Sequence, residues 1–133
     1  MAIPATSATS SATADARGLS MTHAGGAARD AYEHALTDFH GYYGNPLATI
    51  DGALEAAPDF VMGHALRAGM LLTSSEKAAL PLAATSVQRM EALASGANDR
   101  ERRHARAARG LAEEFFDSGK VLARLLRAVE AAA

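Results

Sequence analysis

The stretch Ala57–Leu72, APDFVMGHALRAGMLL, decides how the chain folds. It predicts a helix whose first turn carries Pro58 and Asp59, because a missing N–H and a negative charge are both favourable at a helix N-terminus. Phe60 is placed to pack where this helix begins. Three small residues on this helix allow a neighbouring helix to approach closely: Gly63, Ala65 and Ala68.

The preceding segment, Asn45–Ala57, also predicts a helix. Asn45 is a favourable N-cap residue, and Pro46 suits the first helical position. Apolar residues at helical spacing form its buried seam: Leu47, Ile50 and Leu54. Because almost no loop separates the two helices, we expect them to fold back on each other as an αα-hairpin.

Apolar stripes with a helical period predict further helices on both sides. One spans Ala27–Tyr43 and is stopped by Gly44. Another starts after Ser74–Glu76 and becomes regular near Leu80, because Pro81 interrupts the pattern. Their buried stripes are Tyr32, Leu36, Phe39 and Tyr43 in the first, and Leu80, Ala83, Val87, Met90 and Ala94 in the second.

Two more helices follow towards the C-terminus. Asn98 and Glu101 predict the capping-box start of a fifth helix, and Asp117 or Ser118 caps a last one. The predicted inner face of the fifth helix is His104, Ala108, Leu111 and Phe115, and the last helix carries Val121, Leu122, Leu125, Leu126 and Val129. The sequence therefore predicts an all-α fold of about six helices, stacked as antiparallel hairpins in the manner of an α-solenoid.

The composition of the 133 residues fits closely packed helices. Apolar residues make up 49% and aromatic residues only 5%, and no alternating run of β-branched residues predicts a strand. The net charge of −2 indicates no affinity for nucleic acid or an anionic membrane. The absence of cysteine excludes disulfides and thiolate chemistry, and no apolar run is long enough to cross a bilayer. We expect a cytoplasmic protein.

The first 26 residues are rich in Ser, Thr, Ala and Gly and almost lack large apolar side chains. Such a segment cannot bury enough apolar surface to offset the entropy of ordering, so we expect residues 1–26 to be disordered. Residues 27–133 then form one helical-repeat domain.

The segment from Gly44 through Pro46 and Leu54 to Pro58 resembles the second half of a tetratricopeptide repeat. Three patches, in order along the chain, are similar to the tetratricopeptide-repeat 38 family, a group of long helical-repeat proteins. They are DARGL at Asp15–Leu19, PDFVMGHA at Pro58–Ala65 and NDRERRH at Asn98–His104. The resemblance implies a tetratricopeptide-like α-solenoid without a cofactor, and gives family-motif roles to Pro58, Phe60, Gly63, His64, Arg100, Glu101 and His104.

The resemblance ends near Gly110. The family pattern continues with an aromatic residue, a Gly-Asp turn and later a Pro-Arg-Asp triplet, which Leu111–Phe116 and the Ala-rich end do not supply. We therefore expect a chain truncated at its C-terminus, equivalent to the N-terminal part of a longer repeat protein. A solenoid cut at this point exposes the apolar face that its next repeat covers.

Glu101 and His104 have the Glu-x-x-His spacing of carboxylate-bridged metal sites on helices. With His64 they define the alternative function, a metal-dependent helical enzyme. A complete di-iron site needs a second Glu-x-x-His, which the sequence lacks. The competing interpretation makes Glu101 a helix cap and His64 a neutral imidazole bonded to a backbone carbonyl, paired in the core with His104. His34 and His40 are expected to face solvent.

The favoured interpretation is a non-enzymatic scaffold module that binds a protein or peptide partner, with no catalytic residue and no metal. Its candidate partner-binding residues are the aromatic residues Tyr32, Phe39 and Tyr43 and the basic face Arg102, Arg106 and Arg109. For that basic face, a solvated surface with some ion pairing is the alternative. The apolar last helix predicts self-association or packing on the fifth helix. An inactive fragment of a longer repeat protein is the remaining alternative.

Overall fold

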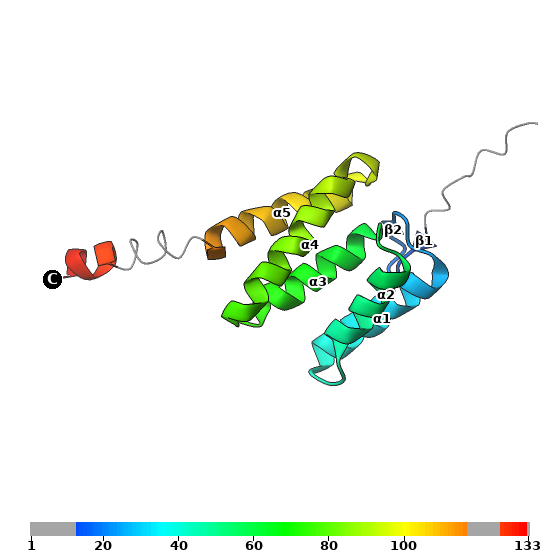
Figure 1. The fold of residues 1–133 in the computed structure, drawn as a ribbon, viewed down its shortest axis with the longest axis horizontal. Helices are drawn as coiled ribbons and strands as arrows, with labels where there is room; N and C mark the ends of the chain where they lie inside the picture. Colours follow the sequence, from blue (N-terminus) through cyan, green and yellow to red (C-terminus); the bar gives the residue numbers. More distant parts are fainter. Residues whose placement is uncertain (1–12, 117–125, 133) are drawn as a thin grey trace, which may run out of the picture.

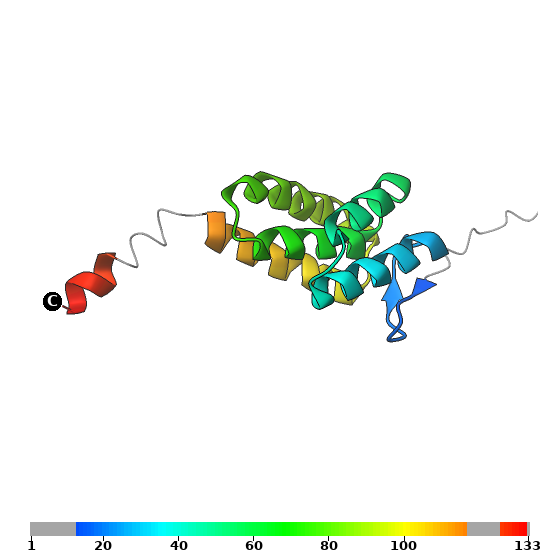
Figure 2. The same cartoon turned by 90° about the horizontal axis from the view of Figure 1, so that it is seen from below.

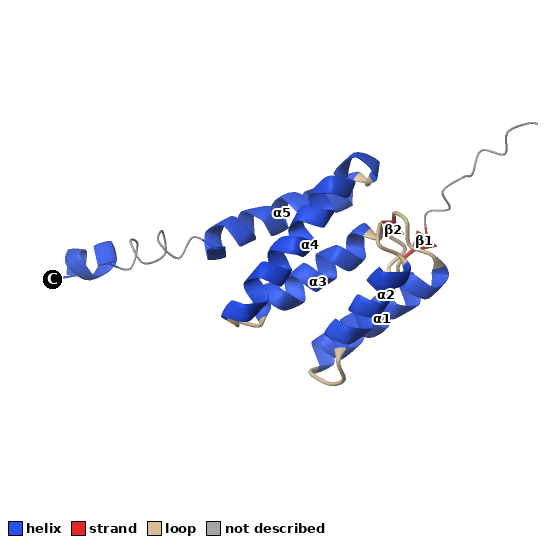
Figure 3. Cartoon of the chain, in the orientation of Figure 1, coloured by secondary structure: helices blue, strands red, loops and turns tan. Residues whose placement is uncertain are grey.

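The computed structural model describes residues 13–116 and 126–132 (Figure 1). Its helices are α1 (Gly26–Gly41), α2 (Pro46–Ala56), α3 (Val61–Thr73), α4 (Leu80–Leu93) and α5 (Asp99–Phe116), with the short 3₁₀ turns η1 (Lys77–Ala79) and η2 (Ala94–Gly96). Residues 126–132 are also helical. Two-residue strands, β1 (Thr13–Ala14) and β2 (Ser20–Met21), form the only sheet within the described ranges (Figure 3). The all-α class is confirmed.

The helix α3, which contains most of the fold-deciding stretch, lies at the centre of the molecule. It contacts α1, α2, α4 and α5. The most extensive pairings join α1 with α2 and α3 with α4, and α5 lies along α3 and α4 (Figures 1 and 2). The helices α2 and α3 contact each other, as the predicted αα-hairpin requires, but α3 shares more of its surface with α4 than with α2.

The turn between α1 and α2 has the predicted N-cap, but α1 ends earlier than predicted. Asn45 Oδ1 accepts a hydrogen bond from the amide of Ala48 at 3.1 Å, which confirms the N-cap of α2. The helix α1 ends earlier than expected, because Tyr42 takes the left-handed conformation at φ 57° before Gly44 does so at φ 68°. Tyr43 therefore lies outside the helix and is 57% exposed, so its assignment to the buried stripe was wrong.

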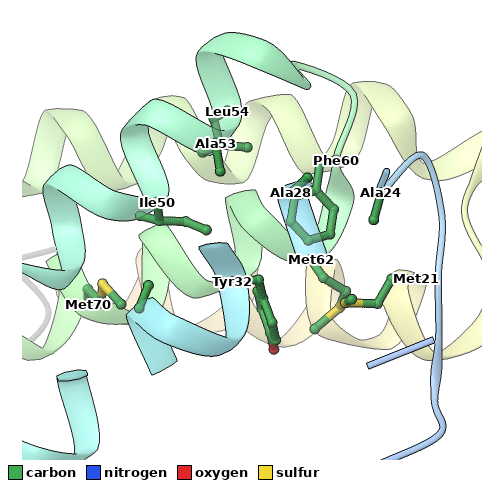
Figure 4. Packing of buried hydrophobic residues seen from close by; sticks show 11 residues of the cluster. Met21, Ala24, Ala28, Tyr32, Ile50, Ala53, Leu54, Phe60, Met62 and Met70 are labelled. Carbon is green, nitrogen blue, oxygen red and sulfur yellow. The ribbon is translucent and has the colours of Figure 1, made fainter. Parts of the chain in front are cut away.

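The main apolar core lies between α1, α2 and the start of α3 (Figure 4). Phe60 is fully buried and meets the Tyr32 ring edge-on, with the ring centroids 5.8 Å apart. The predicted role of Phe60 at the start of α3 is confirmed, but the placement of Pro58 and Asp59 in the first helical turn was wrong, because α3 begins at Val61 and both residues lie in the turn before it. The buried members of this cluster are Met21, Ala24, Ala28, Tyr32, Ala35, Ile50, Ala53, Leu54, Phe60, Met62 and Met70.

Small residues bring α3, α4 and α5 together. Ala68 of α3, Val87 of α4 and Ala112 of α5 form one buried contact. The inward positions of α5 are Glu101, Ala105, Ala108 and Ala112. Of the predicted inner face, Ala108 is confirmed, whereas His104 and Leu111 were wrong, since His104 is exposed and Leu111 is 47% exposed; the Phe115 side chain lies outside the described part. Alanine allows the close helix approach that larger side chains would prevent.

Order begins earlier in the chain than the predicted boundary at residue 26. Strands β1 and β2, blue in Figure 2, pair antiparallel, and the Met21 side chain is fully buried (Figure 4). The expectation of disorder is therefore wrong for residues 13–25, and so is the expectation of no strand; residues 1–12 lie outside the described ranges. Apolar burial alone does not account for this order, because polar contacts to the start of α5 also hold the segment.

The predicted last helix is described only in part. Val121, Leu122 and Leu125 lie outside the described residues, and within 126–132 both Leu126 and Val129 are exposed. The expectation of self-association through this helix stays a prediction.

Candidate functional site

A cleft of about 490 Å³ opens between α2, α3 and α4. Ligand pockets in proteins typically have volumes of about 300–1,000 Å³. The cleft is lined by charged, hydroxyl and apolar side chains from all three helices: Asp51, Leu54, Glu55, His64, Arg67, Leu82, Thr85, Ser86 and Arg89. Seven of its nine lining residues carry polar or charged side chains.

Arg67 of α3 joins the walls of this cleft. Its Nε donates to Asp51 Oδ1 on α2 at 2.6 Å, and its Nη1 donates to Ser86 Oγ on α4 at 2.8 Å. The same Nη1 also donates to the backbone carbonyl of Leu82 at 3.1 Å. One guanidinium thus ties three helices together, which its fixed fork of donors makes possible.

His64 lies one helical turn before Arg67 and also lines the cleft. Its Nε2 donates to the backbone carbonyl of Pro58 at 2.8 Å. Burial lowers the pKa of His64 more than this hydrogen bond raises it, so the imidazole is neutral at pH 7. The predicted hydrogen bond from His64 to a backbone carbonyl is confirmed, and the lowered pKa favours the neutral imidazole. The ring's Nδ1 is then an acceptor without a partner among the described residues.

The remaining charged groups of the cleft differ in their pairing. Arg89 donates to Asp59 Oδ1 at 2.6 Å, which links α4 to the turn before α3. Glu55, in the last turn of α2, is exposed and has no partner in the described part of the chain. Both arginines of the cleft are therefore paired with carboxylates, and the Glu55 carboxylate is not.

The structure does not bring the predicted partner-binding residues together. Tyr32 is in the core, Phe39 is half-buried against it, and Tyr43 is exposed at the α1–α2 turn. Arg102 forms an ion pair with Asp99 at 2.5 Å. Arg109 forms two ion pairs, with Glu91 at 2.5 Å and with Glu113 at 2.9 Å. The Arg106 side chain is exposed. The arginines of α5 thus form an exposed face with ion pairs, as in the alternative interpretation.

The alternative metal site is not assembled either. Glu101 is fully buried, and its two oxygens accept from the amides of Thr22 at 2.7 Å and Asn98 at 3.0 Å. His104 is exposed on α5, whereas His64 lies in the cleft, so the expected pairing of the two histidines is also wrong. Within the described ranges, no group of three or more His, Cys, Asp or Glu residues is placed to hold a metal ion.

A second polar cluster joins the first and third of the three patches quoted above. Asp15 Oδ2 accepts from Arg17 at 3.1 Å and from Arg100 at 3.3 Å, and Arg17 also pairs with Glu33. Burial raises the pKa of Asp15, but hydrogen bonds from Leu19, Arg17 and Arg100 outweigh burial and lower it to about 2. This cluster attaches the β1–β2 segment to α5 and is therefore structural.

Sequence reasoning missed the cleft because its residues are scattered over three helices. Two signals lie on α2 and α3: Asp51 and Glu55 are four residues apart on α2, and Arg67 follows His64 by three residues on α3. Both spacings place the side chains on one helix face. Neither spacing shows that the two faces meet, or that Ser86 and Arg89 of α4 complete the site.

Neither the protein-family models, nor the curated proteins, nor the solved structures give a match to this chain. The similarity to the tetratricopeptide-repeat 38 family therefore stays a prediction from the sequence. Among the described residues, no helix has the length and apolar character to span a bilayer.

Proposed function

We propose that this chain is a non-enzymatic, tetratricopeptide-like helical module that binds a peptide segment of a partner protein in the cleft between α2, α3 and α4. The observation that carries the proposal is the set of contacts made by Arg67, which holds the three helices around a cleft of about 490 Å³. A site fixed before binding avoids part of the ordering cost that otherwise weakens association.

The lining of the cleft supports a peptide ligand. Leu54 and Leu82 offer apolar surface, while Glu55, Thr85 and Arg89 offer charge and hydrogen-bonding groups at the rim. A mixture of apolar surface and a few polar groups is typical of recognition sites. The Ser86 hydroxyl, the most buried hydroxyl of the cleft, accepts a hydrogen bond from Arg67 Nη1, which supports a structural role for this side chain.

Selection from a random displayed-peptide library against the purified chain tests this proposal. Thr85→Trp places a large ring in the cleft and should weaken binding of the selected peptides roughly tenfold or more. Thr37→Trp is the matched control, because Thr37 is also an exposed helical threonine whose hydroxyl donates to the carbonyl four residues earlier. A library that yields no binder, or binders indifferent to Thr85→Trp, contradicts the proposal.

A further inference from the structure

The charges around the cleft do not balance, and this imbalance points to the chemistry of its ligand. Arg67 is paired with Asp51, and Arg89 is paired with Asp59. Glu55 is the charged lining residue left without a partner in the described part of the chain. An anionic group entering the cleft would meet two arginines already paired and one free carboxylate, whereas a cation would pair with that carboxylate.

The backbone strengthens the negative potential near Glu55. Glu55 belongs to the last turn of α2, where carbonyl groups without helical partners form the negative end of the helix dipole. Basic residues in the last turn commonly offset this potential, and α2 has none there. The potential of the free carboxylate and that of the helix end therefore add in the same direction.

The cleft keeps uncommitted acceptors beside the remaining N–H donors of Arg67 and Arg89. His64 uses Nε2 to bond Pro58, which leaves Nδ1 as an acceptor. The Thr85 hydroxyl donates to the Pro81 carbonyl at 3.0 Å, which leaves its oxygen lone pairs available. A guanidinium carries five N–H donors and no acceptor, so it matches several separate acceptors better than the compact ammonium of lysine does.

We infer that the cleft receives an arginine side chain of the partner peptide, with its guanidinium on Glu55 and its aliphatic stem against Leu54 and Leu82. The stem of an arginine packs on apolar surface while its charged end stays with polar groups. The cleft volume exceeds that of one side chain, so residues flanking the arginine also fit. This inference rests on the proposed function and adds the ligand class to it.

Three capped pentapeptides of the form Ala-Leu-X-Leu-Ala, with arginine, citrulline or glutamate as X, serve as probes. Titrations of the isotope-labelled full chain, followed by ¹⁵N–¹H spectra, give the affinity and the location of binding. We expect the arginine peptide to shift amides of α2, α3 and α4 and to bind roughly tenfold tighter than the citrulline peptide, which has the same shape without the charge. The glutamate peptide should bind weakest.

Glu55→Gln should reduce affinity for the arginine peptide roughly tenfold and affect the citrulline peptide, which carries no charge, much less. Glu76→Gln is the matched control, because Glu76 is an exposed glutamate that does not line this cleft. Equal binding of the arginine and citrulline peptides, or no effect of Glu55→Gln, overturns the inference. If the library selects peptides without a cation that Thr85→Trp still blocks, the proposed function stands and the arginine inference fails. If nothing is selected, both fail.

Discussion

Thr22 and Glu101 are 79 residues apart in the sequence, and the Thr22 amide donates a 2.7 Å hydrogen bond to Glu101 Oε1. The other carboxylate oxygen accepts from the amide of Asn98, whose side chain accepts in return from the amide of Glu101 at 2.9 Å. The capping box predicted from the sequence is thus confirmed. It also ties the N-terminal segment to the start of α5, a role that the capping pattern does not show.

We predict that Glu101→Ala lowers the free energy of unfolding by about 2–3 kcal/mol, because it leaves two backbone amides without their charged acceptor in a buried place. Glu101→Gln should cost less, since its amide oxygen still accepts one of the two hydrogen bonds. Urea denaturation followed by circular dichroism measures both effects. Glu76→Ala, at an exposed glutamate, serves as the reference, and an equal cost at both positions would show that the tie contributes nothing.

Protonation of the Asp15 carboxylate should destabilise the folded chain in acid. Its pKa is about 2 in the folded chain against 3.8 for the free side chain, so its contribution is complete above about pH 5 and is lost progressively as the pH falls through 2. That contribution is on the order of 1–2 kcal/mol. Asp15→Asn removes the titrating group, so the stability difference between the unmodified chain and this variant should shrink between pH 4 and pH 2 in urea denaturation. A constant difference across this range would contradict the prediction.

Replacing either of two glycines of α3 by alanine should change the stability of the fold, but in opposite directions. A Cβ at Gly63 would lie 2.7 Å from Phe60 Cδ1 and 2.9 Å from Leu54 Cδ2, so Gly63→Ala should destabilise the fold by about 1–3 kcal/mol. A Cβ at Gly69 meets nothing within 4 Å, so Gly69→Ala should stabilise the helix by up to about 1 kcal/mol. Chemical denaturation of the two variants checks this, and the same sign for both would count against the close packing at Gly63.

The helices and their caps were predictable because local chemistry determines them. Asn45 with Pro46, and Asn98 with Glu101, mark the starts of α2 and α5 almost to the residue. The inner face of α5 was not predictable in the same way. Its inward positions are mostly alanines, whose weak hydrophobicity marks the inner face poorly. The prediction therefore took the larger Leu111 as an inward residue, although it is exposed.

The ordered N-terminal segment and the cleft were not predicted from the sequence, and the reason is the same for both. Both depend on polar contacts between residues far apart in the sequence, such as Asp15 with Arg100 and Arg67 with Ser86. A sequence pattern shows which residues share a helix face, but the partner of a polar side chain depends on how the helices are placed. The polar contacts that form the candidate site were therefore invisible until the packing was known.

The contacts of Arg67 lead to the last prediction. Its side chain is 18% exposed and donates to Asp51, Ser86 and the Leu82 carbonyl, so Arg67→Met should lower the free energy of unfolding by about 1–2 kcal/mol while keeping the apolar stem. The Arg89–Asp59 pair is 44% and 55% exposed, and Arg89→Met should cost less than about 0.5 kcal/mol, because exposed ion pairs contribute little. Urea denaturation of both variants measures the difference. An equal cost for the two arginines would mean that Arg67 does not hold α2, α3 and α4 around the cleft, and the preorganisation argued for peptide binding would lose its support.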